Sequence, residues 1–279
     1  YGHLSILNQG VVNLIYKKDE KIAIDSFDLF NLTEKISQLK KHDFKSLPND
    51  ISLKSINDLT QSIISSLQTD KPYNWLICEG SSEKIYFDFY FKDLKENKNL
   101  RILPVGGFKE VKKIYEHLQL PLKDYSKAIK GKVYCLIDTD KQSFDFNPSE
   151  ENTSIVFRRL LNDNTKTNLV KNNYNITFPT EIEDCLNGEI FRKIIGIFDE
   201  DIEKILTDPK NIKDNSKNSY YYFDLRDSDR EIIKKFFDKD YGYMKIEFAK
   251  KYVEEIEKGL LYGVEYEIPW IDEIKSFFE

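Results

Sequence analysis

From residue 74 onward, short apolar runs alternate with amphipathic stretches of polar and apolar residues. The apolar runs predict strands over residues 74–78, 101–105, 132–137 and 174–178. The amphipathic stretches predict helices over about 83–95, 108–118 and 152–162, and a further helix that begins near Glu181. Apolar strands of five or six residues separated by helices indicate a parallel sheet covered on both faces. We therefore predict an α/β fold, with a Rossmann-like, mainly parallel sheet of about four strands flanked by helices.

The two ends of the chain follow other patterns. Residues 1–70 show apolar stretches at 4–16 and 22–30 around a polar turn at 17–21, and then helical patterns near 32–41 and 55–68. After the last predicted strand, helices are predicted over 188–207, 228–238, 243–258 and 270–278, with a polar loop at 208–224. We predict three parts, an N-terminal linker and helical segment (1–70), a catalytic core (71–200) and a C-terminal helical extension (201–279). The first part carries no chemical motif and fits the tail of an upstream domain.

Charge and cysteine content narrow the class of protein. The formal net charge is -6, whereas a protein that only coats nucleic acid is usually basic. An enzyme that holds metal ions through carboxylates can be acidic overall. Three cysteines without metal-ligand spacing indicate a reduced, cytoplasmic protein. No apolar run is long enough to span a membrane, so we predict no membrane partner.

Acidic residues and glycines follow three successive predicted strands. Glu79 and Gly80 end the first strand, Gly106 and Gly107 end the second, and Asp138 opens an Asp-x-Asp pair with Asp140 after the third. In open parallel sheets, ligands bind outside the carboxyl ends of the strands. Carboxylates crowded at one edge repel each other, and a hard divalent cation such as Mg²⁺ relieves this repulsion. The sequence therefore predicts a metal site formed by Glu79, Asp138 and Asp140.

A fourth acidic group follows the fourth predicted strand. Glu181, Glu183 and Asp184 stand at the predicted start of a helix, where the helix dipole favours negative charge. If this strand lies in the same sheet, the group supplies ligands for a second metal ion, as in-line phosphoryl displacement often requires. The sequence leaves open which of the three acids would bind it.

Each of these motifs also has a purely structural reading. A glutamate at a strand end fits a solvated side chain, Asp-x-Asp pairs are common by chance, and acids at a helix start usually cap the helix. All of these motifs together, in this order and at equivalent strand ends, rarely occur by chance, so the combination favours a functional site.

Three segments resemble the Toprim family of catalytic domains. The stretch 76–84 (LICEGSSEK) resembles the opening Toprim motif, 103–107 (LPVGG) its second strand and glycine turn, and 136–140 (LIDTD) its Asp-x-Asp motif. The resemblance covers about residues 74–200. The Glu181–Asp184 group and the Lys-x-x-Phe pattern at Lys245 are similar to the overcoming-lysogenization-defect (OLD) nucleases. They are also similar to anti-phage Toprim effectors linked to retron reverse transcriptases or ATPases.

The resemblance implies Mg²⁺- or Mn²⁺-dependent cleavage of DNA or RNA phosphodiesters, with two ions. Glu79 would be a metal ligand or general base, Asp138 and Asp140 would hold metal, and the Glu181–Asp184 group would hold the second ion. Lys245 would neutralise the scissile phosphate, although a solvated helix lysine is an equally simple reading. Candidate substrate-binding positions are Gly80, Lys84, Gly106 and Gly107.

Other functions remain open at this point. A topoisomerase or primase also uses a Toprim domain, but no companion DNA-gate domain is evident and the cysteines give no zinc domain. A glycosyltransferase would use Asp138 and Asp140 and leave Glu79 without a role, and a haloacid-dehalogenase phosphatase would place its Asp-x-Asp on the first strand. A non-cleaving Toprim-fold regulatory module that binds a partner is the non-enzyme alternative. Expected partners are nucleic acid and an upstream or separate ATPase or reverse-transcriptase component.

Overall fold

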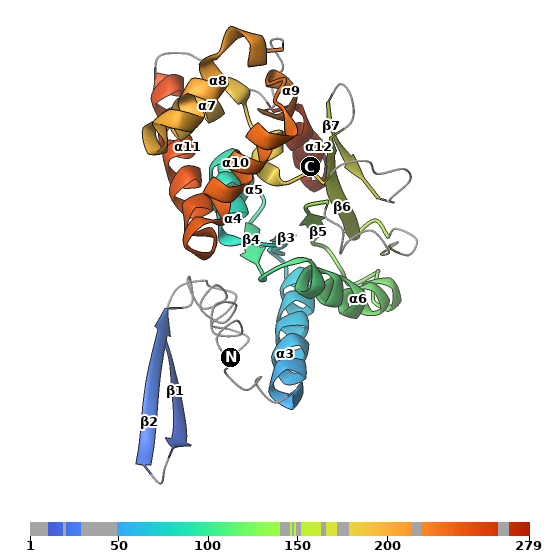
Figure 1. Ribbon diagram of the computed structural model, residues 1–279. Helices are drawn as coiled ribbons and strands as arrows, with labels where there is room; N and C mark the ends of the chain where they lie inside the picture. The colour runs from blue at the N-terminus through green and yellow to red at the C-terminus, as the bar shows by residue number, and fades with distance from the viewer. Residues whose placement is uncertain are drawn as a thin grey trace.

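The centre of the molecule is a five-stranded, mainly parallel sheet flanked by helices, which is a Rossmann-like α/β arrangement (Figure 1). The computed structural model describes residues 11–18, 21–28, 49–139, 146, 148, 152–162, 166–171, 179–213, 219–261 and 268–279. The strand order is β4-β3-β5-β6-β7. These strands are β3 (Asn74–Cys78), β4 (Leu100–Pro104), β5 (Val133–Ile137), β6 (Ile155–Asn162) and β7 (Thr167–Val170).

The first four strands of this order are parallel, and β7 pairs with β6 in the antiparallel direction. All residues of β3 and β5 are buried, as expected for central strands covered on both faces. Because neighbouring side chains of a strand point to opposite faces, Leu76 and Tyr134 join one hydrophobic cluster while Ile77 and Cys135 join the other.

The two faces of the sheet carry unequal layers. One face packs on α3 (Asn49–Leu67) and α6 (Phe108–Asp124). The other carries a thicker, aromatic-rich layer made of α4 (Ser81–Tyr90), α5 (Lys92–Asn97), α7 (Gly188–Phe198), α8 (Glu200–Thr207), α10 (Asp227–Asp238), α11 (Tyr243–Leu261) and α12 (Pro269–Phe278).

Shorter elements connect these layers. They are the 3-10 turns η1 (Ile182–Cys185), η2 (Pro209–Asn211) and η3 (Lys239–Gly242), and the one-turn helix α9 (Ser219–Tyr222). Near the N-terminus, β1 (Val11–Lys18) and β2 (Lys21–Asp28) form an antiparallel pair. Lys17, Lys18 and Lys21 of the predicted turn belong to these strands, and residues 19 and 20 lie outside the described residues. No helix in the described part of the chain is long and apolar enough to cross a membrane.

The predicted helix at 152–162 is wrong, because this segment is the strand β6. Arg159 within this strand is fully buried, and its Nη2 donates to the Phe146 carbonyl at 2.6 Å. Pairing with β5 and β7 on its two sides decides the conformation of this apolar run. The strand predicted at 174–178 and the helix predicted at 32–41 lie outside the described residues.

Several predicted helices differ in extent. The helix expected from Glu181 is only the 3-10 turn η1, and the helix expected over 83–95 is divided at Phe91 into α4 and α5. The helix expected over 188–207 is divided at Asp199, whose side chain caps α8. By contrast, α6 continues through Pro121 to Asp124.

Candidate active site

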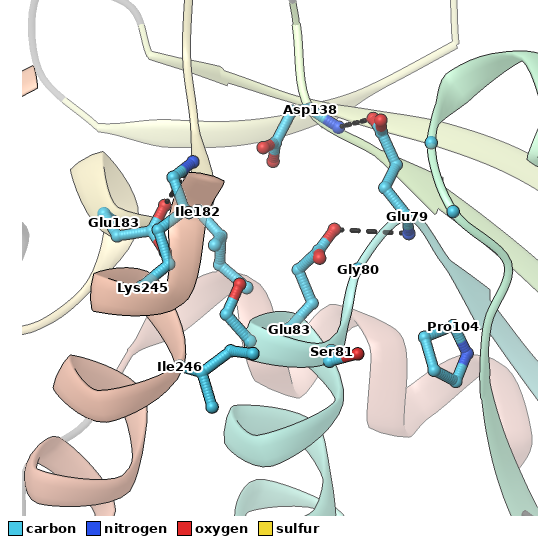
Figure 2. A pocket seen from close by; sticks show the side chains of 14 residues that line it. Glu79, Gly80, Ser81, Glu83, Pro104, Asp138, Ile182, Glu183, Lys245 and Ile246 are labelled. Atoms are coloured by element: carbon cyan, nitrogen blue, oxygen red, sulfur yellow. Dashed lines mark hydrogen bonds and ion pairs between the residues drawn. The ribbon is translucent and has the colours of Figure 1, made fainter. Parts of the chain in front are cut away.

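A cavity of about 280 Å³ lies at the carboxyl ends of β3, β4 and β5 (Figure 2). Helix α4, the turn η1 and the first turn of α11 close its sides. Its lining residues are Glu79, Gly80, Ser81, Ser82, Glu83, Pro104, Gly106, Gly107, Asp138, Ile182, Glu183, Gly242, Lys245 and Ile246. The sheet edge therefore brings together most of the residues that the sequence analysis selected as candidates.

The carboxylates along this edge are held by backbone N–H groups of their neighbours. Glu79 Oε1 accepts a hydrogen bond from the Asp138 N–H at 2.9 Å, which links the end of β3 to the end of β5. Glu83 Oε1 accepts from the Glu79 N–H at 3.2 Å (Figure 2). Glu79, Glu83 and Asp138 thus form one connected acidic group along the cavity.

The glycines of this edge allow a tight turn beside the acids. The N–H groups of Gly106 and Gly107 both donate to the Glu79 carbonyl, at 2.7 and 3.0 Å. The φ angles of Gly106 and Gly107 are 92° and 117°, a region that residues with a Cβ rarely adopt. This turn leads directly into the N-terminus of α6, which faces the cavity.

Lys245, which stands on α11 far along the chain from the strands of the sheet edge, brings a positive charge to the cavity. Its Nζ lies 2.9 Å from Glu181 Oε2 and 3.5 Å from Glu183 Oε2. The Glu183 side chain is almost fully buried, whereas the Glu181 side chain is 40% exposed. Lys245 is therefore not a solvated helix lysine, because it forms the cationic wall of the cavity opposite Asp138 (Figure 2).

The three acids of the Glu181–Asp184 group have different positions. Glu183 lines the cavity. Glu181 binds Lys245. Asp184 turns back, and its Oδ2 accepts from the Glu181 N–H at 3.0 Å in a capping box. The structure thus favours Glu183 over Asp184 as the member that faces a ligand in the cavity.

Burial and like charge raise the pKa of the cavity carboxyl groups. Burial, and then the neighbouring Glu183, raise the pKa of Glu83 to about 7. Burial raises the pKa of Asp138 well above its usual range, and the charge of Glu83 adds to the effect. Burial also raises the pKa of Glu183, although Lys245 opposes the shift. Burial lowers the pKa of Lys245, but Glu183 and Glu181 outweigh it, so the pKa of Lys245 lies well above its usual value.

Several carboxylate oxygens of the cavity are buried without a hydrogen-bond partner. Within the described residues these are Asp138 Oδ1 and both oxygens of Glu183, although Glu183 Oε2 has the Lys245 ammonium 3.5 Å away as an ion-pair partner. Such atoms are costly unless a cation or a donor compensates them. Among the described residues, no group of three or more His, Cys, Asp or Glu side chains is arranged to hold a metal ion, and Asp140 lies outside the described residues. Asp138, Glu79, Glu83 and Glu183 are the residues that could hold Mg²⁺ or Mn²⁺, which prefer oxygen ligands.

Glu83 is the main site residue that the sequence analysis missed. The available signal was its spacing of four residues from Glu79 across the turn from β3 to α4. The buried Ser81 and Ser82 also line the cavity and were not selected as candidates from the sequence. Lys84, which was expected to bind substrate, forms an ion pair with Asp88 on α4 and is not among the lining residues.

Comparison with known proteins finds no matching family model, no matching curated protein and no matching solved structure. Any functional assignment therefore depends on the motifs of the chain and on the geometry of the cavity.

Proposed function

We propose that this chain is a Toprim-type nuclease that cleaves phosphodiester bonds of DNA or RNA with Mg²⁺ or Mn²⁺, using two ions. The observation that carries the proposal is the pair of buried carboxylates in one cavity, Asp138 after β5 and Glu183 on η1. Among the described residues, their oxygens Asp138 Oδ1 and Glu183 Oε1 have no hydrogen-bond partner, and Glu183 Oε2 has only the ion pair with Lys245. They face one cavity together with the Lys245 ammonium. Acids alone would fit a passive cation site, but acids beside a partly buried lysine fit a site that binds cations and phosphate together.

Each charged residue has a definite task under this proposal. Asp138, Glu79 and Glu83 hold cations on the sheet side, and Glu183 holds a cation on the helical side. A bound divalent ion would supply charge stabilisation for the attacking and leaving oxygens. Lys245 neutralises charge that develops on the phosphate, and Glu181 holds the lysine in place through the 2.9 Å contact.

The biological role is proposed from the Toprim resemblance alone. By that resemblance the protein is the toxic effector of an anti-phage defence system, gated by an upstream or separate ATPase or reverse-transcriptase component. The alternative within the same fold is a regulatory module that binds a partner without cleaving nucleic acid.

A cleavage assay tests the proposal. Wild type and Asp138→Asn are incubated with supercoiled plasmid, linear DNA, tRNA and single strands, in Mg²⁺ and in Mn²⁺. Because the substitution keeps the shape of the side chain and removes its charge, we expect cleavage to fall by about 100-fold or more. Asp201→Asn, which changes an exposed aspartate on α8, is the matched control and should cut like the wild type.

Undiminished cleavage by Asp138→Asn would exclude this cavity as the active site. A wild type that neither cuts any of the substrates nor binds Mn²⁺ in calorimetry would contradict the nuclease proposal itself. Mn²⁺ binding without cleavage of any substrate would favour the regulatory module or an effector that needs its partner.

A further inference from the structure

Two buried threonines connect the two acidic groups behind the cavity. Thr139 directly follows Asp138, and Thr180 directly precedes Glu181. Their backbones form an isolated antiparallel bridge, with Thr139 N–H to Thr180 carbonyl at 2.9 Å and Thr180 N–H to Thr139 carbonyl at 2.8 Å. Both threonines are fully buried. We call this pair the threonine strap.

The side chains of the strap fasten it to the end of β6. The last residue pair between β5 and β6 is Ile137 with Arg159. Beyond that pair, the Thr139 hydroxyl donates to the Leu160 carbonyl at 2.5 Å, and the Thr180 hydroxyl accepts from the Asn162 N–H at 3.0 Å. Each hydroxyl thus forms a hydrogen bond with a backbone group of β6 that lies beyond the end of β5.

The register of the strap determines how the acids face each other. In an antiparallel pair, the residue after one partner lies opposite the residue before the other. The bridge therefore places Asp138 opposite Glu181, two residues from Glu183. The Asn162 side chain extends the fastening, because its Nδ2 donates to the Asp184 carbonyl at 3.5 Å. One bridge thus holds acids that come from the end of β5 and from η1.

We propose that the threonine strap positions the second acidic group, Glu181 and Glu183, against Asp138, and that the Thr180 hydroxyl is its main positioning contact. The inference rests on the proposed function, because it assigns the strap to the same metal site. The strap lies behind the carboxylates and does not line the cavity. Partners behind metal ligands commonly determine how the ligands are oriented.

The hydroxyl of Thr180 can be tested separately from its volume. Valine has nearly the shape of threonine but cannot accept from the Asn162 N–H. The loop that carries Glu181 and Glu183 therefore loses this hydrogen bond to β6 and keeps the longer 3.5 Å contact from Asn162 Nδ2 to the Asp184 carbonyl. Serine keeps the hydroxyl and loses only the methyl group. Catalytic and metal sites respond to displacements of their ligands of about 1 Å, so loosening of this loop should lower metal affinity.

The experiment measures Mn²⁺ binding by calorimetry and thermal unfolding without metal, on the full chain. We expect Thr180→Val to raise the Kd for Mn²⁺ by roughly 10–100-fold, and Thr180→Ser to bind close to the wild type. The matched control is Thr60→Val, which removes another buried threonine hydroxyl, one that donates to the Ile56 carbonyl within α3. Thr60→Val should unfold at a lower temperature and bind Mn²⁺ unchanged.

Three outcomes would overturn the inference. If the wild type binds Mn²⁺ and Thr180→Val binds it equally well, the strap does not position the site, and the proposed function stands. If the wild type binds no Mn²⁺ and cuts nothing, the proposed function fails and the inference fails with it. If Thr180→Val does not fold, Thr139→Val tests Mn²⁺ binding after removal of the other hydroxyl. If neither variant folds, the strap serves the general stability of the protein and the inference fails.

Discussion

Among the residues of the cavity, Glu83 shows most clearly how the position of a side chain alters its pKa. It stands in the first turn of α4, four residues after Glu79, and its carboxylate accepts the Glu79 N–H. Gly80 makes this possible, because a Cβ at that position would lie 2.7 Å from Glu83 Oε2. The carboxyl group is thereby held inside the acidic group, where burial and Glu183 raise its pKa to about 7.

The raised pKa of Glu83 predicts a pH-dependent stability in the absence of metal. The folded pKa of about 7 lies above the unfolded value of about 4.3. Between these values the folded protein binds more protons, so its stability falls as the pH rises. Glu83→Gln keeps a hydrogen-bond acceptor and removes this titration. We expect it to be more stable than the wild type by ~1–3 kcal/mol above pH 7.

Thermal unfolding in a chelator from pH 5 to pH 8 measures this difference. The advantage of Glu83→Gln should shrink as the pH falls towards 5, where the wild-type carboxyl group is protonated in the folded state. Glu189→Gln, at an exposed position on α7, should follow the wild type throughout. A constant difference across the whole pH range would contradict the assignment of the titration to Glu83.

At the scale of elements, the strands that carry motifs could be predicted and the segments around them could not. Strands β3, β4 and β5 are mostly apolar runs followed by glycine or acid, so local pattern and tertiary role agree. The β6 segment contains Arg158 and Arg159, and only its pairing with β5 makes it a strand. The acidic group at 181–184 resembled a helix start, but Asp184 closes a capping box within one 3-10 turn.

The residues of the candidate active site could likewise be predicted only in part from the sequence. The residues at strand ends could be predicted, because the carboxyl ends of parallel strands meet at one edge. The threonine strap could not, because Thr139 and Thr180 are brought together only by the tertiary bridge. Similarly, the spacing of four residues between Glu79 and Glu83 marks Glu83 only as a candidate, because the contact of its carboxylate with the Glu79 N–H depends on the turn from β3 to α4.

The division between α7 and α8 gives a prediction for one helix cap. Asp199 Oδ1 accepts from the N–H groups of Asp201 and Ile202, at 3.2 and 3.1 Å. Asp199→Ala removes both contacts and should destabilise the protein by about 1 kcal/mol. Asp199→Asn keeps the cap and loses only the ion pair with Lys239, an exposed contact of little value. Urea unfolding of both variants checks this, and equal destabilisation by alanine and asparagine would exclude the cap as the cause.

Across the whole molecule, one aromatic-rich cluster joins the sheet to the C-terminal helices. Leu76 of β3 and Tyr134 of β5 share it with Phe191 of α7, Phe248 of α11 and Trp270 of α12. The Trp270 indole N–H donates to the Cys185 carbonyl at 3.1 Å, which fastens α12 to the turn that carries Glu183. The helices after residue 200 therefore cover the sheet face next to the cavity and contribute Lys245 to its wall.

This arrangement predicts that residues 71–200 do not fold without the rest of the chain. The fragment would expose the apolar side chains of α4, α7 and β7 that α11 and α12 cover, and exposed apolar area of this kind favours aggregation. We expect cooperative thermal unfolding from the full chain and none from the fragment. A fragment that unfolds cooperatively and binds Mn²⁺ would show that the core is independent of the extension.

The late position of Lys245 has a consequence for synthesis of the protein. Lys245 follows Asp138 by 107 residues, the difference between the two positions. Chains grow from the N-terminus at roughly 5–20 residues per second, so the acids of the sheet edge leave the ribosome many seconds before the lysine. Under the proposed function, a chain that terminates early carries the acids without their cation. The proposed nuclease activity would thus begin only after the segment that carries Lys245 has been made.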